Sequence, residues 1–580
     1  MLFRRFLLDR VSTIWMLASL ATILLLPLII GVGLYLKAAP LFEHQSLTEL
    51  LTSSAWKPSE GKFGFWPFIA GSFYVTILSF VLAAPICLFS AIYLTQFASK
   101  NLIKVMHPVI DILAGLPSVI YGVWGVLIVV PFISKLAPFF NTSSSGYSIF
   151  SGGIVLAVMC VPYILNMLIE VFNTVPIGMK EASLSLGATF WESVKHVVIR
   201  KSYAGIISAF GLGIAKAFGE TIAVMMVVGN RIQLTHNPFD AAYPLPALIA
   251  NNYGEMLSIP MYDSALMFAA LVLLVIILAI NLLFRYFIYR AQRQSVMNKG
   301  RIIEEKIFKV LSAMAAYSLI AILISIITII FIKGFNALSF DMILKTPKGG
   351  FYYGGEGGVL NAILGSVYIA FGATIIAVLI GLPSALYINV HLIRMKRTQN
   401  TIRYFLDALW GIPSIVYGAF GFAFMLFIGM NASLLAGILT VSMLITPIMV
   451  RTFDEVLSTI PIGLQEASLA LGSTKMETAY KVMLKQGFSG FITAALLSFG
   501  RGIGDAASVL FTAGYTDLIQ VTLDEPAATL PLAIFFQLGS PIPEVRERAF
   551  ASAAILTIMI LIISIIARLL SIKYSKSNFK

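Results

Sequence analysis

Five ionisable residues stand inside apolar stretches of this 580-residue chain. Lys216 and Glu220 lie four residues apart in one stretch, and Arg501 and Asp505 repeat this spacing in another. Arg451 stands in a third stretch. Residues four apart share a face of a helix, so each carboxylate could hold the cation beside it. Ionisable groups inside membrane helices usually line a substrate path, and these cations would compensate an anion there, bidentately for Arg and as a point charge for Lys.

Plainer interpretations of the same residues stay open. The two spaced pairs could only neutralise each other within their helices, and Arg451 could extend to the cytoplasmic interface. The Pro-Ser pairs at 117–118 and 413–414 are also ambiguous. Ser118 and Ser414 could bind an anion at a helix break, or the prolines could only kink the bundle.

Membrane-spanning helices must position these residues. The chain is 59% hydrophobic and 12% charged, with a mean hydropathy of +0.91, and a soluble domain has about twice that charged fraction. Apolar runs long enough to span a bilayer recur along the chain. They predict an all-α membrane protein of about twelve helices, near 13–36, 68–95, 109–133, 150–172, 203–228, 265–288, 307–332, 360–388, 403–430, 433–456, 488–513 and 549–571.

The chain contains an internal repeat. D-I-L-A-G-L-P-S-V-I-Y-G-V-W-G (111–125) returns as D-A-L-W-G-I-P-S-I-V-Y-G-A-F-G (407–421), with eight of fifteen positions identical. P-I-G-M-K-E-A-S-L-S-L-G-A-T (176–189) returns as P-I-G-L-Q-E-A-S-L-A-L-G-S-T (461–474), with ten of fourteen identical. The repeat predicts two homologous six-helix halves that could enclose a path. We place them at residues 1–290 and 307–580, joined by a basic cytoplasmic linker at 291–306.

The distribution of basic residues predicts the orientation. Cytoplasmic loops of membrane proteins carry the excess of Lys and Arg. With the N-terminus inside, 28 of the 40 basic residues fall on the cytoplasmic side, ten fall outside and two lie within helices. We therefore expect a multi-pass protein of the cell membrane with both termini in the cytoplasm. The net charge of +13 reflects this bias, and no basic patch on a soluble fold suggests nucleic-acid binding.

The second repeated segment lies on the predicted cytoplasmic side and has the pattern E-A-S-x-x-x-G. Its residues are Glu181, Ala182 and Gly187 in the first half, and Glu466, Ala467 and Gly472 in the second. Mixed polarity predicts a short amphipathic helix along the interface that docks a soluble partner. A plain surface helix is the alternative, but such a helix need not keep the pattern twice in register.

These motifs resemble those of a known family. The E-A-S-x-x-x-G segments resemble the E-A-A-x-x-x-G loop of the permease subunits of binding-protein-dependent ABC importers, with Ser183 and Ser468 in place of Ala. The G-L-P-S and G-I-P-S elements, and A-K-A-F-G-E-T at 215–221, resemble phosphate-specific (Pst-type) permeases. G-R-G-I-G-D at 500–505 resembles the sister subunit, so the chain looks like both subunits fused.

The resemblance implies a type I ABC importer permease fold and transport of inorganic phosphate by alternating access. It implies that E-A-S segments couple to a dimer of ATP-binding cassette ATPases, that an extracytoplasmic phosphate-binding protein delivers substrate, and that Arg451 takes part in transport. ATP and Mg²⁺ would belong to the ATPase, because this chain has no phosphate-binding loop of its own. We therefore expect a transport subunit rather than an enzyme, without bound cofactor or metal.

Other functions stay open. The charges would also suit molybdate, tungstate or sulfate, so phosphate depends on the resemblance. An ion-coupled secondary transporter would also have duplicated bundles and intramembrane charges, although it gives no reason for two E-A-S-x-x-x-G segments. A membrane receptor or scaffold would be expected to carry an added soluble domain.

Overall fold

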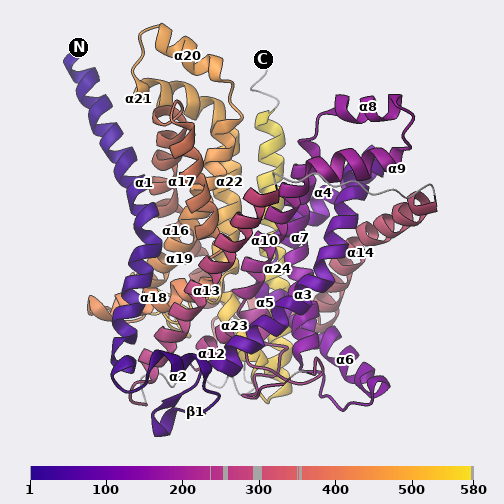
Figure 1. Ribbon diagram of the computed structural model, residues 1–580. Coiled ribbons are helices and arrows are strands. Elements are labelled where there is room, and N and C mark those ends of the chain that lie inside the picture. Colours follow the sequence, from indigo (N-terminus) through magenta and orange to yellow (C-terminus); the bar gives the residue numbers. More distant parts are fainter. Residues whose placement is uncertain are drawn as a thin grey trace. The chain divides into compact units, whose positions relative to one another are not determined.

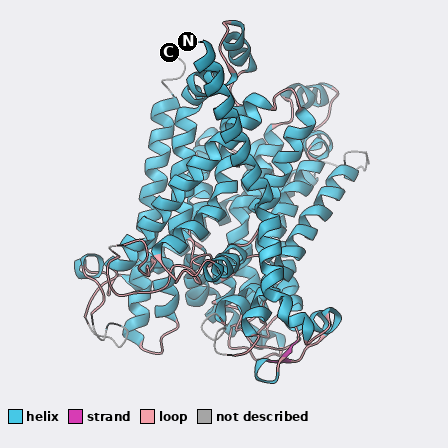
Figure 2. Ribbon diagram, turned by 90° about the vertical axis from the view of Figure 1, so that its left-hand side faces the viewer, coloured by secondary structure: helices cyan, strands magenta, loops and turns pink. Residues whose placement is uncertain are grey.

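Helices form nearly all of the chain in the computed structural model, which describes residues 2–235, 237–252, 259–291, 303–348, 351, 356–520 and 522–575. Within these ranges the sheet is a small antiparallel hairpin of β1 (Trp56–Lys57) and β2 (Lys62–Phe63), with Trp56 opposite Phe63 (Figure 2). The all-α membrane fold predicted from composition is thus confirmed.

Ten helices among the described residues are long and apolar enough to cross a membrane, or twelve if each of two bent pairs is one span. The pairs are 190–199 with 203–218, bent by 68°, and 396–410 with 414–427, bent by 87°. The upper count agrees with the twelve predicted helices. The prediction of one continuous helix over 403–430 is wrong, because a residue that precedes a proline, here Ile412 before Pro413, disfavours helical backbone.

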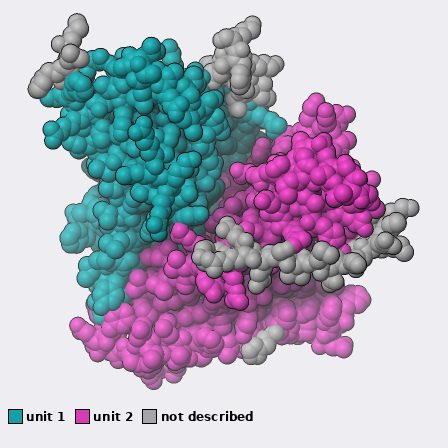
Figure 3. All heavy atoms as spheres, turned by 45° about the horizontal axis from the view of Figure 1, so that its top comes forward, with its two compact units in different colours: residues 1–39, 334–580 teal, residues 40–333 magenta. Residues whose placement is uncertain are grey.

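The chain forms two compact units, coloured separately in Figure 3. Unit 1 comprises residues 1–39 and 334–580. Its helices are α1 (Leu2–Ala38), α15 (Phe340–Leu344), α16 (Leu360–Leu386), α17 (Lys396–Trp410), α18 (Ser414–Phe427), α19 (Leu434–Ser458), α20 (Ile462–Ala470), α21 (Lys475–Glu477), α22 (Leu484–Gly504), α23 (Leu530–Leu538) and α24 (Pro543–Ser575), with π-helical segments at Tyr387–His391 and Thr478–Met483.

Unit 2 comprises residues 40–333. Besides the hairpin it contains α2 (Leu47–Thr52), α3 (Trp66–Ile92), α4 (Lys100–Gly115), α5 (Ser118–Trp124), α6 (Val130–Leu136), α7 (Ile149–Asn173), α8 (Ile177–Ser185), α9 (Phe190–Ser193), α10 (Tyr203–Phe218), α11 (Ile222–Met225), α12 (Leu245–Asn251), α13 (Tyr262–Ala291) and α14 (Ile303–Gly334), with π-helical segments at Tyr93–Phe97, Gly125–Val129 and Val194–Ile199. Short 3₁₀ turns occur at Ala39–Glu43, Pro58–Glu60 and Ala137–Phe140.

The compact units do not follow the boundaries predicted from the repeat. The first helix of each half packs with the other half: α1 belongs to unit 1 and α14 to unit 2. Gly33 of α1 lies against the ring of Phe420 in α18, and Trp191 stacks on Phe308 of α14 with 4.8 Å between ring centroids. Of the predicted linker at 291–306, residues 292–302 lie outside the described part of the chain.

In each unit, a short helix with the E-A-S sequence lies at one end. Figure 1 shows α8 at the end of unit 2 away from the β1–β2 hairpin, and α20 at the end of unit 1 away from α23. Both helices end at a glycine with left-handed backbone, Gly187 at φ +83° and Gly472 at φ +80°. The Gly187 N–H donates to the Leu184 carbonyl at 2.9 Å, as in common helix C-terminal motifs. The glycine of the repeated pattern therefore terminates the helix.

The helix that follows each of these glycines, α9 in unit 2 and α21 in unit 1, begins with the same capping arrangement. Thr189 caps α9 and exchanges hydrogen bonds with Glu192, and Thr474 does the same with Glu477 at α21. This reciprocal capping box satisfies two backbone donors that a helix start leaves unpaired. Each E-A-S helix is thus followed by a glycine that ends it and by a threonine that caps the next helix.

Replacing Gly33 by Leu should destabilise unit 1. A Cβ at this position would meet the Phe420 ring at 2.7 Å, closer than packing allows. We expect a loss of about 1–3 kcal/mol, typical of overpacking, measured as a lower midpoint of thermal unfolding in lipid nanodiscs. Gly178→Ala is the control, because its Cβ would meet nothing within 4 Å. Equal midpoints would contradict the packing of α1 on α18.

Replacing Gly472 by Ala should loosen the end of α20. Its Cβ would have open space, so the left-handed backbone alone opposes the substitution, by about 1–2 kcal/mol. Faster amide hydrogen exchange at residues 468–474 is the expected result. Gly463→Ala, in the same helix but without positive φ, should leave exchange there unchanged. Equal hydrogen-exchange rates at residues 468–474 in the two variants would contradict this role of Gly472.

Candidate functional site

The ammonium group of Lys216 lies at the end of α10 and on an aromatic ring. Its Nζ is 2.6 Å from the centre of the Tyr163 ring, an arrangement in which the ring face attracts the cation. The Tyr163 hydroxyl donates to the Ala114 carbonyl at 2.8 Å, in the last turn of α4. Through Tyr163, the structure brings Lys216 to the break between α4 and α5.

Glu220 does not share a helical face with Lys216 as the spacing predicts. Helix α10 ends at Phe218, and the Glu220 N–H donates to the Ala217 carbonyl at 3.2 Å in a tight turn. Lys216 and Glu220 both lie close enough to the buried Cys160 for their charges to act on it.

Arg501 and Asp505 are not paired in this structure, and the prediction of their pairing is wrong. Helix α22 ends at Gly504, and Asp505 instead accepts hydrogen bonds from the backbone N–H of Ser508, at 2.9 Å, and from its hydroxyl. The Nε of Arg501 is buried and has no hydrogen-bond partner. Arg501 lies near Tyr417, on which its charge acts. A buried unpaired donor of this kind is costly and is available to an anion.

The repeated Pro-Ser elements break their helices, and tyrosines repair the hydrogen bonding. Proline has no N–H to donate to the carbonyl four residues earlier. The Tyr121 hydroxyl donates to that carbonyl of Leu113 at 2.6 Å, and Tyr417 donates to Leu409 at 3.3 Å. The P-S-x-x-Y spacing therefore has a structural role.

Ser118 and Ser414 are the first residues of α5 and α18. Among the described residues, neither hydroxyl has a hydrogen-bond partner. The packing role of the proline is clear from the tyrosine contacts, and anion binding by the two serines stays a prediction.

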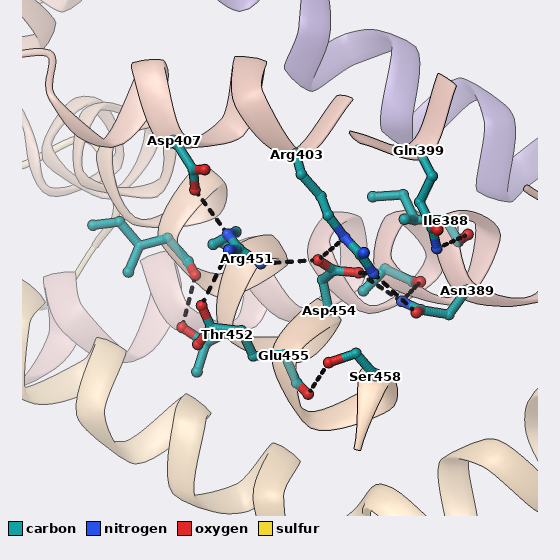
Figure 4. Close-up of polar contacts among 12 residues, drawn as sticks. Ile388, Asn389, Gln399, Arg403, Asp407, Arg451, Thr452, Asp454, Glu455 and Ser458 are labelled. Carbon is teal, nitrogen blue, oxygen red and sulfur yellow. Dashed lines mark hydrogen bonds and ion pairs between the residues drawn. The ribbon is translucent and has the colours of Figure 1, made fainter. Parts of the chain in front are cut away.

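Arg451 is engaged by three carboxylates (Figure 4). Its Nε donates to Asp407 at 2.7 Å, its Nη1 to Asp454 at 3.0 Å, and its Nη2 lies 3.5 Å from Glu455. Asp454 is fully buried, whereas the Arg451 and Asp407 side chains are 23% and 31% exposed. Arg451 can meet an anion only if these pairs open, so its place on a substrate path stays a prediction.

A second arginine completes this network. Arg403 contacts both oxygens of Asp454, at 2.7 and 2.8 Å, and the Asn389 side-chain amide donates to the same carboxylate at 2.8 Å (Figure 4). Two arginines thus share one buried carboxylate. Removing one partner of a buried ion pair costs about 3–5 kcal/mol, because the other charge is left uncompensated. We define the polar network as Asn389, Arg403, Asp407, Arg451 and Asp454.

Sequence analysis missed this network, although two signals were present. Asp454 stands three residues after Arg451 in an apolar helix, a spacing that allows pairing. Asp407 opens the repeated motif four residues after Arg403. What the spacing could not indicate is that α17 and α19 lie side by side.

The E-A-S residues lie on the surface of their units. Glu181, Ala182, Glu466 and Ala467 are exposed, and Gly187 and Gly472 end the helices. The exposed leucines that precede these glycines are nearly alike, with Leu186 89% and Leu471 90% accessible.

The inward sides of α8 and α20 differ. Lys180 of α8 donates to the Gln96 side chain at 2.9 Å, and partial burial lowers the pKa of Lys180 from its ordinary value. The equivalent residue of α20, Gln465, is buried and donates to the Asn389 carbonyl at 3.5 Å.

The N-terminal helix also reaches the α20 region, which the sequence did not suggest. Arg5 forms an ion pair with Glu477 and donates to the Gly472 carbonyl at 3.3 Å. Asp9 accepts a hydrogen bond from the Met476 N–H at 2.8 Å. These contacts fix the start of α1 beside the end of α20.

Known proteins resemble this chain in two segments. The model of the family "Binding-protein-dependent transport system inner membrane component" matches residues 85–296 and 373–576, together more than two-thirds of the chain. The "Probable ABC transporter permease protein YqgH" of Bacillus subtilis is 41% identical over 240 residues, covering 41% of this chain and 76% of the relative. The "Phosphate transport system permease protein PstC" of Xylella fastidiosa is 33% identical over 257 residues (42% and 79%).

The "Probable phosphate transport system permease protein PstC" of Methanocaldococcus jannaschii is 33% identical over 298 residues, covering 49% of this chain and 94% of its own. The MetNI methionine ABC transporter, solved in inward-facing conformations, matches 40% of this chain and 95% of its own chain, with 19% identity and a TM-score of 0.31. Each relative spans about half of this chain, as two fused permeases would predict. The chain therefore belongs to the family of inner membrane components of binding-protein-dependent transport systems, and it carries the family's domain twice.

Proposed function

We propose that this chain is the transmembrane permease component of an ATP-driven importer that moves inorganic phosphate into the cytoplasm. The observation that carries the proposal is the pair of E-A-S helices, α8 and α20, each exposed and each ended by a left-handed glycine. A pair of like docking elements suits a dimeric motor, and membership of the family supports the coupling to an ATPase.

The exposed faces of α8 and α20 support docking of two copies of one ATPase chain. Ile177 and Ile462 are 70% and 53% accessible, and Leu186 and Leu471 are almost fully accessible. Large apolar side chains exposed in register on a cytoplasmic surface are typical of an interaction site. The helices differ at three positions. Lys180 and Gln465 face inward. Met179 and Leu464 are both apolar and similarly exposed, and Ser185 and Ala470 are both small, so a partner would meet nearly the same surface twice.

Phosphate is supported by the relatives and by the charges. PstC proteins of several organisms are phosphate transport permeases by name, at 31–33% identity. Lys216 and Arg501 each lie in the last turn of a helix beside a Pro-Ser break, and either could hold an oxyanion. The same chemistry would accept molybdate, tungstate or sulfate, which are the runner-up substrates.

The proposed topology places both termini, α8 and α20 in the cytoplasm. An extracytoplasmic phosphate-binding protein would dock on the opposite face, and the permease would be a multi-pass protein of the cell membrane. ATP and Mg²⁺ would be bound by the ATPase, and this chain would have no catalytic activity of its own. An ion-coupled secondary transporter is the alternative outside this class.

The mechanism we propose is alternating access. Closure of the ATPases on ATP would draw the two E-A-S helices together and open the permease outward. The anion would then pass the cations Lys216 and Arg501, and hydrolysis would return the inward-open state. A cation held on an aromatic ring, like Lys216 on Tyr163, can bind an anion weakly enough to release it.

Reconstitution with candidate partners tests the function. The chain is placed in liposomes with an ATPase and a binding protein, and uptake of labelled phosphate is compared with uptake of sulfate and molybdate. Uptake that needs ATP and both partners and prefers phosphate supports the proposal. ATP-independent uptake by the chain alone would move it to the secondary transporters.

Lys216→Gln and Arg501→Gln should each reduce phosphate uptake by at least about tenfold in this assay. A charge-assisted hydrogen bond contributes about 1.5–3 kcal/mol, and both variants remove the charge while keeping a polar side chain. Lys135→Gln, which removes an exposed cation elsewhere in unit 2, should transport normally. Normal uptake by both site variants, with assembly intact, would remove these residues from the path.

Leu186→Asp and Leu471→Asp should each weaken ATPase binding by about tenfold or more. Burial of a leucine side chain contributes about 1.5–3 kcal/mol, which is lost when the docking face becomes charged. Co-purification of the ATPase with the permease measures the effect. Leu518→Asp, at a 75% exposed position away from α20, is the matched control. Undiminished co-purification would place the docking surface elsewhere.

A further inference from the structure

A continuous set of polar contacts joins α20 to the helices of unit 1. Gln465 of α20 donates to the backbone carbonyl of Asn389, a long hydrogen bond of 3.5 Å, and the Asn389 side chain contacts Asp454 of α19. Arg403 of α17 holds the other side of Asp454. The path from the docking helix into the bundle is therefore short, and it ends on a fully buried charge.

The equivalent place in unit 2 is a cavity. The repeat aligns Asn389 with Thr95, Arg403 with His107, and Asp454 with Ile169, since each pair occupies the same position of corresponding elements. These three unit 2 residues line a cavity of about 110 Å³, together with Leu94, Ile103, Met106, Ile110 and Asn173. Where unit 1 has two arginines around a buried carboxylate, unit 2 has open space beside smaller or apolar groups.

The two arrangements resist deformation differently. Moving α17 away from α19 would take Arg403 from the buried Asp454 and leave that carboxylate with Arg451 as its one remaining cation among the described residues, which is unfavourable. Moving Asn389 away from Asp454 would remove one more buried hydrogen bond. A cavity has no partner atoms to lose, so the walls around it can shift at little cost. In unit 2 the α8 helix is tied at its Lys180 to Gln96, and Gln96 in turn donates to Thr95 at the cavity wall.

We propose that the two halves transmit the movement of their docking helices unequally. Asn389, Arg403 and Asp454 act as positioning residues that fix α20 to α17 and α19, so this helix and its bundle move as one body. Helix α8 is linked through Gln96 to Thr95 at the cavity wall and can shift before its bundle follows. The inference rests on the proposed function for its use in transport, but the unequal attachment of the two helices is a property of the chain itself.

The test exchanges residues between equivalent positions. One variant, Asn389→Thr with Arg403→His and Asp454→Ile, gives unit 1 the residues of unit 2. The converse variant, Thr95→Asn with His107→Arg and Ile169→Asp, gives unit 2 the residues that unit 1 has at these three positions. Each borrowed residue already occurs at that position of the same fold, and each variant leaves the other unit unchanged. An exposed ion pair, Asp341 with Lys345, provides the control Asp341→Asn with Lys345→Gln.

Amide hydrogen exchange of the purified full chain in nanodiscs measures how firmly α8 and α20 are each held to their own bundle. The peptides 177–187 and 462–472 have nearly the same sequence, so their intrinsic exchange rates are matched. We expect α20 to exchange at least about fivefold more slowly than α8, at the low end of coupling between sites. The unit 1 triple variant should remove most of that difference. The converse variant should slow hydrogen exchange in α8, and the control variant should leave the rates of both helices unchanged. Equal hydrogen-exchange rates of α8 and α20 in the natural chain would overturn the proposal. A difference in rate that persists in the unit 1 triple variant would also overturn it, and would assign the protection of α20 to the contacts of Arg5 and Ser468 instead.

Transport provides the second readout. In liposomes with both partners, the unit 1 triple variant should move about fivefold less phosphate, or less still, per ATP hydrolysed, while ATP hydrolysis continues. A merely structural role would lower both rates together and leave their ratio unchanged, which would contradict positioning. If the natural chain transports no phosphate, the proposed function fails, and hydrogen exchange still decides the unequal attachment.

Discussion

Backbone hydrogen bonding in an apolar environment is the constraint on which this structure depends. A carbonyl without a partner costs several kcal/mol where water is absent. Pro117 and Pro413 each remove a donor in the middle of a repeated motif, and Tyr121 and Tyr417 supply a hydroxyl in its place. These contacts accompany a sharp bend of the chain, which is 87° at Pro413 in unit 1. The bends place Lys216 and Arg501 beside helix ends rather than beside continuous helices.

Arg501 differs from the arginines of the polar network in this arrangement. Arg501 has a buried Nε without a partner, whereas Arg403 and Arg451 are held by carboxylates. The Nε of Arg501 is thus a buried donor without a protein acceptor, whereas the paired arginines maintain the packing of α17 on α19. Charges that look alike in the sequence are thus divided by whether a carboxylate of a neighbouring helix reaches them.

Sequence could predict what depends on composition, repetition and local spacing. The apolar runs predict the helices, the duplicated motifs predict two halves, and the glycines of the E-A-S segments predict two similar docking helices. Sequence could not indicate that α10 ends at Phe218 and α22 at Gly504, because apolar residues continue beyond both ends. The expected pairing of Asp505 with Arg501 failed for this reason, and Asp407 was missed as a partner of Arg451 because it lies on another helix.

The exchange of first helices has a consequence for biosynthesis. Unit 2 is one continuous stretch, residues 40–333, whereas unit 1 needs residues 1–39 together with 334–580. Chains generally fold from the N-terminus as they are made, yet the partners of α1, such as Phe420, leave the ribosome almost four hundred residues later. Helix α1 must therefore wait in the bilayer, with its contact face turned to lipid, while all of unit 2 is synthesised. The first segment to be inserted is among the last to find its place, which makes the newly made α1 the stage at which a membrane chaperone or a quality-control protease has the most time to act.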